Sequence, residues 1–330
     1  MIPSDFDEYM KISSGERYLW ATYLILVFLS SIIGDSIILI ASTRYNAIRL
    51  NRIIVAVMQH IAICDITASL SYVLPMMISL IANGWILGGP LAYCHVYFEH
   101  CSMVGSNLFI CALTCSKLLI LKFPLRKQRW TTKKAHVACA CIWILSLVFP
   151  AIRLALDQRE LIFDFISYTV NYGIPSQYSK ADDIAFITMH VLSNYIPLLT
   201  VIITTSLTLL HLNRSRKLAK WNGREKRWQG IVTVVATATV FCISVIPGDM
   251  AIYTILHPAE VEEAKLRRFC DTSLTFNIVC NFFIYSLTVP SFRNFIKSKI
   301  SQLFARLSRC LGVCRKLQVD SAQRAQHNLA

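Results

Sequence analysis

The sequence predicts an all-α membrane protein, a seven-transmembrane helix bundle with a C-terminal interfacial amphipathic helix. Three observations predict it. The 330 residues are 55% hydrophobic and only 16% charged, whereas a soluble domain is about 25% charged. Apolar runs of roughly 20 residues, enough to cross a bilayer, recur along the chain. Basic residues are concentrated in alternate segments between those runs, as the positive-inside rule requires.

The predicted spans are separated by basic, polar or Pro/Gly-containing loops. They cover residues 19–43, 53–82, 92–121, 136–156, 184–212, 229–257 and 269–290. The chain then divides into an extracellular N-terminus (1–18), the transmembrane domain (19–290), the interfacial helix (291–307) and a cytoplasmic tail (308–330). No internal repeat or second domain is visible in the sequence.

Charge sets the orientation. The first, third and fifth loops and the C-terminal tail hold 25 of the 33 Lys and Arg residues, while acidic residues gather in the N-terminus and the other loops. Because cytoplasmic loops carry the excess of Lys and Arg, we expect the N-terminus outside the cell and the C-terminus in the cytosol. The net charge of +14 then faces anionic lipid and a cytosolic partner, which favours the lipid bilayer over nucleic acid.

The segment after the last span has the pattern of an amphipathic helix. Its apolar residues recur at three- and four-residue spacing, and Lys297 and Lys299 occupy the other face, as in a helix lying in the membrane interface. Cys310 and Cys314 follow it, where palmitoylation would add an anchor. Two unmodified thiols are the alternative.

Short motifs mark the spans. The second span carries Ile61-Ala-Ile-Cys-Asp65, and the seventh ends in Asn281-Phe-Phe-Ile-Tyr285. The third is followed by Lys122-Phe-Pro124-Leu125, and the sixth has Phe241 six residues before Pro247. Their order and spacing resemble the rhodopsin-like (class A) G-protein-coupled receptors over about residues 19–305, with a weaker likeness to amine-type receptors.

The chain also departs from that family's pattern. Lys117 stands where the family has the Arg of its DRY motif, Val245 replaces the Trp of CWxP, and Asp35 replaces the Asn of the first span. The loop at 157–183 contains no Cys, so the family's usual disulfide cannot form there. Cys94 is left to pair with Cys270 or to stay free.

The resemblance implies a sodium pocket formed by Asp65, Ser106, Asn277 and Asn281, with no other cofactor. Oxygen ligands around a hard cation make chemical sense, and Asn277 and Asn281 share a helix face because they are four residues apart. A hydrogen-bonded network without sodium is the alternative. Asp35 complicates the pocket, because two carboxylates close together disfavour the charged form of one, so that one of the two would be protonated.

A second set of residues faces outward. Glu99 lies eighteen residues before Lys117, where aminergic receptors place the Asp that pairs with the ligand's ammonium. Asp249, Asp271, His190 and Ser193 are expected beside it. An ionisable residue inside the membrane indicates function, so these acids suggest a cationic ligand. Pairing with basic residues at the rim is the alternative.

A third set faces the cytosol. Lys117 would oppose Arg227, and two cations cannot form the ion pair that holds the family's resting state. Lys is also a poor substitute for Arg in bidentate pairing. The expected activation and G-protein face consists of Lys117, Pro124, Leu125, Arg227, Phe241, Pro247 and Tyr285.

The sequence therefore predicts a receptor in the cell membrane that transmits an extracellular amine or basic peptide signal to a heterotrimeric G protein. No catalytic motif is visible, so an enzyme is not expected. One alternative is a seven-helix binding protein that does not couple to G protein. The other is a transporter or channel, which would predict inverted repeats or broken helices.

Overall fold

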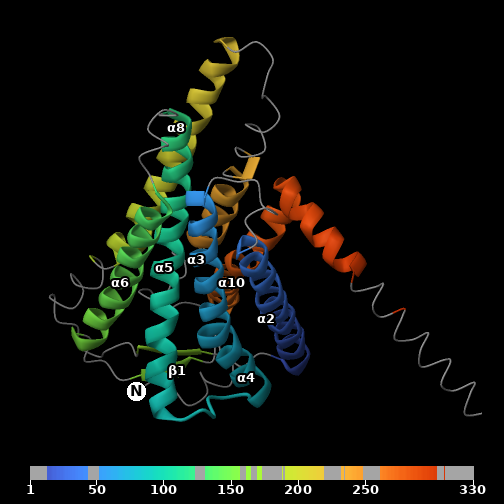
Figure 1. The fold of residues 1–330 in the computed structure, drawn as a ribbon. Helices are drawn as coiled ribbons and strands as arrows, with labels where there is room; N and C mark the ends of the chain where they lie inside the picture. The colour runs from blue at the N-terminus through green and yellow to red at the C-terminus, as the bar shows by residue number, and fades with distance from the viewer. Residues whose placement is uncertain are drawn as a thin grey trace, which may run out of the picture.

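The computed structural model describes residues 13–43, 52–122, 131–156, 161–164, 169–172, 188, 190–218, 232–233, 235–247, 261–302 and 308. Long helices form an elongated bundle in which α5 packs against α3, α6 and α8 (Figure 1). The long helices are α2 (Ser14–Thr43), α3 (Arg52–Ala68), α5 (Gly89–Lys122), α6 (Thr132–Leu156), α8 (Ile196–Leu218) and α10 (Val261–Thr288).

The helices follow the predicted spans closely, and the two largest extensions are in α8 and α10. Helix α8 continues to Leu218 instead of ending at 212, and α10 begins at Val261 instead of 269. Of the predicted sixth span, the structure describes a shorter apolar helix, Val235–Pro247. Within the described residues, five helices are long and apolar enough to cross a membrane, and a bent pair supplies one more.

Two spans contain a π-helical turn next to a proline. The segment η1 (Ser69–Val73) joins α3 to α4 (Leu74–Ala82), and η3 (Val191–Tyr195) leads into α8. Pro75 and Pro197 follow these turns by two residues. Proline has no N–H to donate and its ring crowds the preceding turn, so a wider turn accommodates it.

A short β-hairpin lies in the loop between α6 and α8 and adds an element that the all-α prediction did not include. Strand β1 (Leu161–Asp164) pairs antiparallel with β2 (Thr169–Tyr172). Val170 of β2 is buried against Ala92 and Val96 of α5. The hairpin therefore covers the end of the bundle at which α5 begins (Figure 1).

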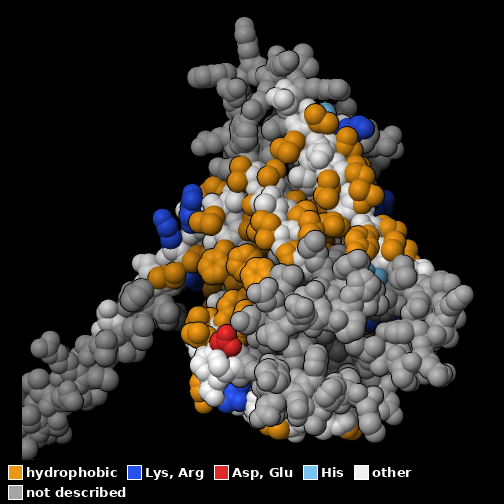
Figure 2. Space-filling view, turned by 180° about the vertical axis from the view of Figure 1, so that it is seen from behind, with side chains coloured by type: hydrophobic (Ala, Val, Ile, Leu, Met, Phe, Trp, Pro, Cys, Tyr) orange, Lys and Arg blue, Asp and Glu red, His pale blue; other side chains and the backbone are white. Residues whose placement is uncertain are grey.

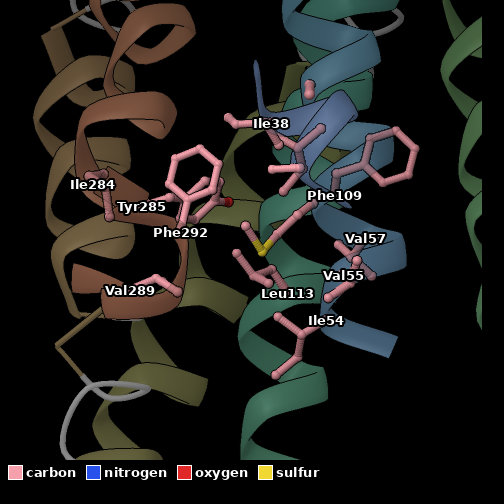
Figure 3. Close-up of a cluster of buried hydrophobic side chains, with 14 of the residues drawn as sticks. Ile38, Ile54, Val55, Val57, Phe109, Leu113, Ile284, Tyr285, Val289 and Phe292 are labelled. Carbon is pink, nitrogen blue, oxygen red and sulfur yellow. The ribbon is translucent and has the colours of Figure 1, made fainter. Parts of the chain in front are cut away.

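The main hydrophobic core joins the first described helix, α2, to the helix that follows α10. Figure 3 shows Ile38 of α2, Phe109 and Leu113 of α5 and Tyr285 of α10 converging with Phe292 of the C-terminal helix. All five side chains are fully buried or nearly so. In a lipid bilayer such side chains stabilise the bundle through close van der Waals packing rather than through removal of apolar surface from water.

The outer surface is apolar as well. Only 17% of the most apolar window of α6 is buried inside the bundle, and Ile144 of α6 and Leu199 of α8 are exposed. Figure 2 shows apolar side chains over much of the described surface on one face. Helices satisfy their own backbone hydrogen bonds, so such a surface suits contact with lipid.

The chain turns sharply after α10. The helix Pro290–Gln302 makes an angle of 97° with Thr275–Thr288 and leaves the bundle sideways (Figure 1). Phe292 is buried, while Lys297 and Lys299 are exposed. This arrangement is that of an amphipathic helix lying across the end of a bundle.

Candidate functional site

Polar side chains in the middle of the bundle meet along one buried face of α10. The Asn281 side-chain amide donates to Oδ2 of Asp65 at 2.8 Å, and the Asn277 amide donates to Oγ of Ser106 at 3.2 Å. All four side chains are buried. The four residues of the predicted sodium pocket therefore form two contacts one helical turn apart, from α10 to α3 and to α5.

Asp35 lies beside this network. Ser31 donates to Oδ2 of Asp35 at 2.9 Å, and Ser69 donates to Oγ of Ser31 at 2.7 Å. Asp35 is 0% and Asp65 1% exposed, and the two carboxylates interact electrostatically. In each, Oδ1 has no hydrogen-bond partner among the described residues. Asp35 was predicted from the sequence, whereas Ser31 was not, although its spacing of four residues from Asp35 places it on the same face of the helix.

Tyr285 belongs to the same region. Its ring packs in the main core (Figure 3), and its hydroxyl is buried without a hydrogen-bond partner in the described part of the chain. The hydroxyl lies within electrostatic range of both Asp65 and Asp35. Tyr285 therefore contributes a third buried oxygen near the two carboxylates.

In the half of the bundle that carries the hairpin, Glu99 lies one turn beyond His95. The distance from His95 Nε2 to Glu99 Oε2 is 3.8 Å. His95 Nδ1 donates to the Ser71 carbonyl at 2.6 Å, because a carbonyl can only accept. The rings of Tyr72 and Trp85 lie 6.0 and 5.3 Å from the His95 ring. Glu99 is thus held next to His95, whose ring packs with two aromatic rings, and 20% of the Glu99 side chain is exposed.

His190 and Ser193 lie together at the start of the fifth span. The Asn194 amide is 3.2 Å from His190 Nδ1, and Asn107 of α5 donates to Asn194 Oδ1 at 2.9 Å and to the Ser193 carbonyl at 3.0 Å. Asn107, whose side chain connects α5 to this turn, was not predicted from the sequence. Asp249 lies outside the described residues and the side chain of Asp271 is not described, so the convergence of the three acids stays a prediction.

Near the opposite end of α5, Lys117 is buried at 7% exposure. Phe241 is fully buried with Ile110 and Val201, and Pro247 is the last described residue of its helix. A hydrogen bond of 2.8 Å from Thr233 to Thr288, which the sequence analysis missed, joins the sixth span to the end of α10. Besides Asp249, five more of the predicted residues lie outside the described part of the chain: Pro124, Leu125, Arg227, Cys310 and Cys314.

Two histidines that looked scattered in the sequence are in contact. Trp143 donates to His60 Nδ1 at 3.1 Å, and His60 Nε2 lies 3.2 Å from His136 Nδ1. An indole N–H only donates, so Nε2 of His60 carries its proton and donates to His136. This order of donors argues against a metal ion between the two rings. No group of three or more His, Cys, Asp or Glu in the described ranges could hold a metal.

Comparison with known proteins identifies the class of this bundle. Residues 34–289 match the family described as 7 transmembrane receptor (rhodopsin family). The chain belongs to this family of G-protein-coupled receptors. It is therefore a multi-pass membrane protein and a receptor rather than an enzyme.

Individual relatives are distant. Galanin receptor 2b of Danio rerio is 23% identical over 292 residues, which are 86% of this chain and 75% of that receptor. G-protein coupled receptor 183-A of the same species is 24% identical over 59% of this chain and 54% of its own length. Dopamine receptor 1 of Drosophila melanogaster is 27% identical over 42% of this chain and 28% of its own length. These relatives, one named for galanin and one for dopamine, agree with the receptor family but do not indicate one type of ligand.

Proposed function

We propose that this receptor transmits the binding of an extracellular cationic ligand, an amine first and a basic peptide second, to a heterotrimeric G protein. In this proposal the N-terminus is extracellular and the ligand enters at the hairpin end of the bundle. The observation that carries the proposal is the Glu99 carboxylate, largely buried on α5 next to His95, whose ring packs with those of Tyr72 and Trp85.

The Glu99 carboxylate lies on a predicted membrane span, where a charged group is costly. Insertion scales put the cost of an acid near the membrane centre at about 2.5–3.5 kcal/mol. An ammonium near one carboxylate gains roughly 4 kcal/mol at an effective dielectric of about 20, before desolvation. That gain is enough to select a cation over a neutral analogue. Asp249 and Asp271 are proposed to complete the site.

The test is binding of a cationic agonist, found by screening amines and basic peptides with a second-messenger readout. Glu99→Gln, Asp249→Asn and Asp271→Asn are expected to weaken binding. Glu16→Gln is the matched control, since Glu16 is an exposed acid at the start of α2. If all three variants bind the agonist as tightly as the wild type, the acids serve the fold or the rim and the ligand is not selected by charge.

A receptor that binds ligand without G-protein coupling is the second candidate. It is favoured by Lys117, which stands at the position of the family's DRY Arg and is buried. Nucleotide exchange on purified G proteins of each class, with agonist bound, separates the two. Exchange supports coupling, and its absence across all classes supports the second candidate.

We also propose that the receptor has a cation pocket at Asp65, for which the family resemblance implies sodium. The donor set fits a hard cation, because it consists of a carboxylate and neutral oxygens from Ser106, Asn277 and Asn281. One oxygen of Asp65 is buried without a hydrogen-bond partner in the described residues, which supports the fit. Asp65→Asn is expected to remove the dependence of thermal stability on the cation.

A further inference from the structure

The ring of His95 is fixed in one tautomer by the span that it packs against. Pro75 has no N–H to offer the Ser71 carbonyl four residues before it, and the π-helical turn η1 lies at this point of the span. His95 Nδ1 donates to the Ser71 carbonyl at 2.6 Å. Because a neutral imidazole has one donor and one acceptor nitrogen, Nε2 of His95 is left as an acceptor.

Two aromatic rings hold the His95 ring in place. The Tyr72 ring is stacked on it with an interplanar angle of 16°, and the Trp85 ring is tilted against it at 41°. The Trp85 indole donates in turn to the Gly88 carbonyl at 2.9 Å. The His95 side chain is only 1% exposed. The direction of Nε2 is therefore set by this packing and by the hydrogen bond to Ser71.

Nε2 of His95 faces the carboxylate of Glu99, which lies one turn further along α5. The distance from Nε2 to Oε2 of Glu99 is 3.8 Å. A charged imidazolium would close on the carboxylate to about 2.7–2.9 Å, and two acceptors cannot hydrogen-bond to each other. The separation suits instead a single nitrogen that lies about 2.9 Å from each acceptor and donates to both. Such a nitrogen needs two N–H bonds.

We propose that His95 and Glu99 together bind the nitrogen of the ligand, and that the receptor selects ammonium groups with at least two N–H bonds. Primary and secondary amines have them, as does the lysine side chain of a basic peptide, whereas a tertiary ammonium has one and a quaternary ammonium none. The inference rests on the cationic ligand proposed above and adds the class of its nitrogen. Oε2 of Glu99 is buried, and a turn of this side chain, 20% of which is exposed, admits the ammonium. Rotamer changes of this kind are common on binding.

The test compares amines that differ only in methylation of the nitrogen. The probes are phenethylamine and Nα-acetyl-lysine amide, each with the monomethyl, dimethyl and trimethyl forms of its amine. Thermal unfolding of the purified full-length receptor, titrated with each probe, gives the dissociation constants. We expect the primary and monomethyl forms to bind with similar affinity. The dimethyl form should bind roughly 10- to 100-fold more weakly, since one charge-assisted hydrogen bond is lost.

Two variants separate the acceptor from its surroundings. His95→Asn keeps a side-chain N–H for the Ser71 carbonyl but has no atom in place of Nε2, and His95→Phe keeps the ring that packs with Tyr72 and Trp85. In both we expect the primary amine to bind as weakly as its dimethyl form, so that the selectivity disappears. His211→Asn is the matched control, because His211 is exposed on α8, and it should leave the selectivity unchanged.

The wild-type series decides the matter even where a variant fails to fold. Equal affinity of the primary and dimethyl forms would overturn selection by N–H bonds and leave the cationic ligand of the proposed function standing. A decline that begins with the first methyl group, or that persists in His95→Asn, would indicate steric exclusion and also overturn the inference. If neither primary amine raises the unfolding midpoint, the cation selection at Glu99 fails, and this inference fails with it.

Discussion

Substitution of Gly34 tests how closely α2 approaches α10. A Cβ atom on Gly34 would lie 2.7 Å from Cγ and 2.8 Å from Cβ of Phe282. Carbon atoms in favourable contact lie about 3.5–4.0 Å apart, so Gly34→Ala creates an overlap with two atoms. The Cβ of Phe282 is fixed to its backbone, and a change of rotamer cannot remove it. The two helices must therefore separate, and overpacking of this kind costs about 1–3 kcal/mol.

The assay is the midpoint of thermal unfolding of purified receptor. Gly34→Ala should lower it, while Gly89→Ala should not, because a Cβ at Gly89 meets nothing within 4 Å. Phe282→Ala removes Cγ but keeps Cβ, so Gly34→Ala should cost less in that background without becoming neutral. An unfolding midpoint of Gly34→Ala equal to that of the wild type would contradict the close approach of α2 and α10. So would an equal drop in the midpoint with Phe282 and with Phe282→Ala.

Three further outcomes are expected. Tags on both chain ends should be stained in intact cells at the N-terminus only, and surface labelling of the C-terminal tag would reverse the topology. Lys117→Arg combined with Arg227→Glu should create the missing ion pair and lower basal signalling in a second-messenger assay, whereas unchanged signalling would exclude this face as the switch. Trp143→Phe should lower the free energy of unfolding by about 0.5–1.5 kcal/mol, because the hydrogen bond from the indole N–H to His60 is lost. Equal unfolding midpoints of this variant and the wild type would contradict that hydrogen bond.

The span pattern could be predicted because the bilayer imposes a simple rule. A helix in lipid needs about 20 apolar residues, and most spans end within a few residues of the observed helices. The helical extensions beyond the predicted spans were harder to predict, because a helix that continues outside the membrane does not need apolar residues. Helix α8 continues to Leu218 through basic residues that have good helix propensity but look like a loop by hydropathy.

Part of the site was predictable for a similar reason. Asn277 and Asn281 share a helix face through their spacing alone, and the resemblance supplied their partners on other helices. Contacts such as Asn107 with Asn194 depend on the rotation and axial offset of two helices, which no local pattern specifies. The orientation of Glu99 beside His95 is of the same kind. Sequence spacing gives the face of a helix but not which neighbour meets it.

Gly34 and Asp35 are adjacent, and their effects are coupled. The missing Cβ of Gly34 lets α2 lie against Phe282 of α10, and the next residue, Asp35, is fully buried beside the Asp65 network. Electrostatic attraction to a cation is stronger where water is excluded. Gly34→Ala should separate α2 from α10 and admit water, and it should therefore reduce the cation-dependent rise in the unfolding midpoint although every proposed cation ligand remains. The comparison is the size of that rise in Gly34→Ala and in Gly89→Ala. Equal rises would show that the α2–α10 contact does not control the cation pocket.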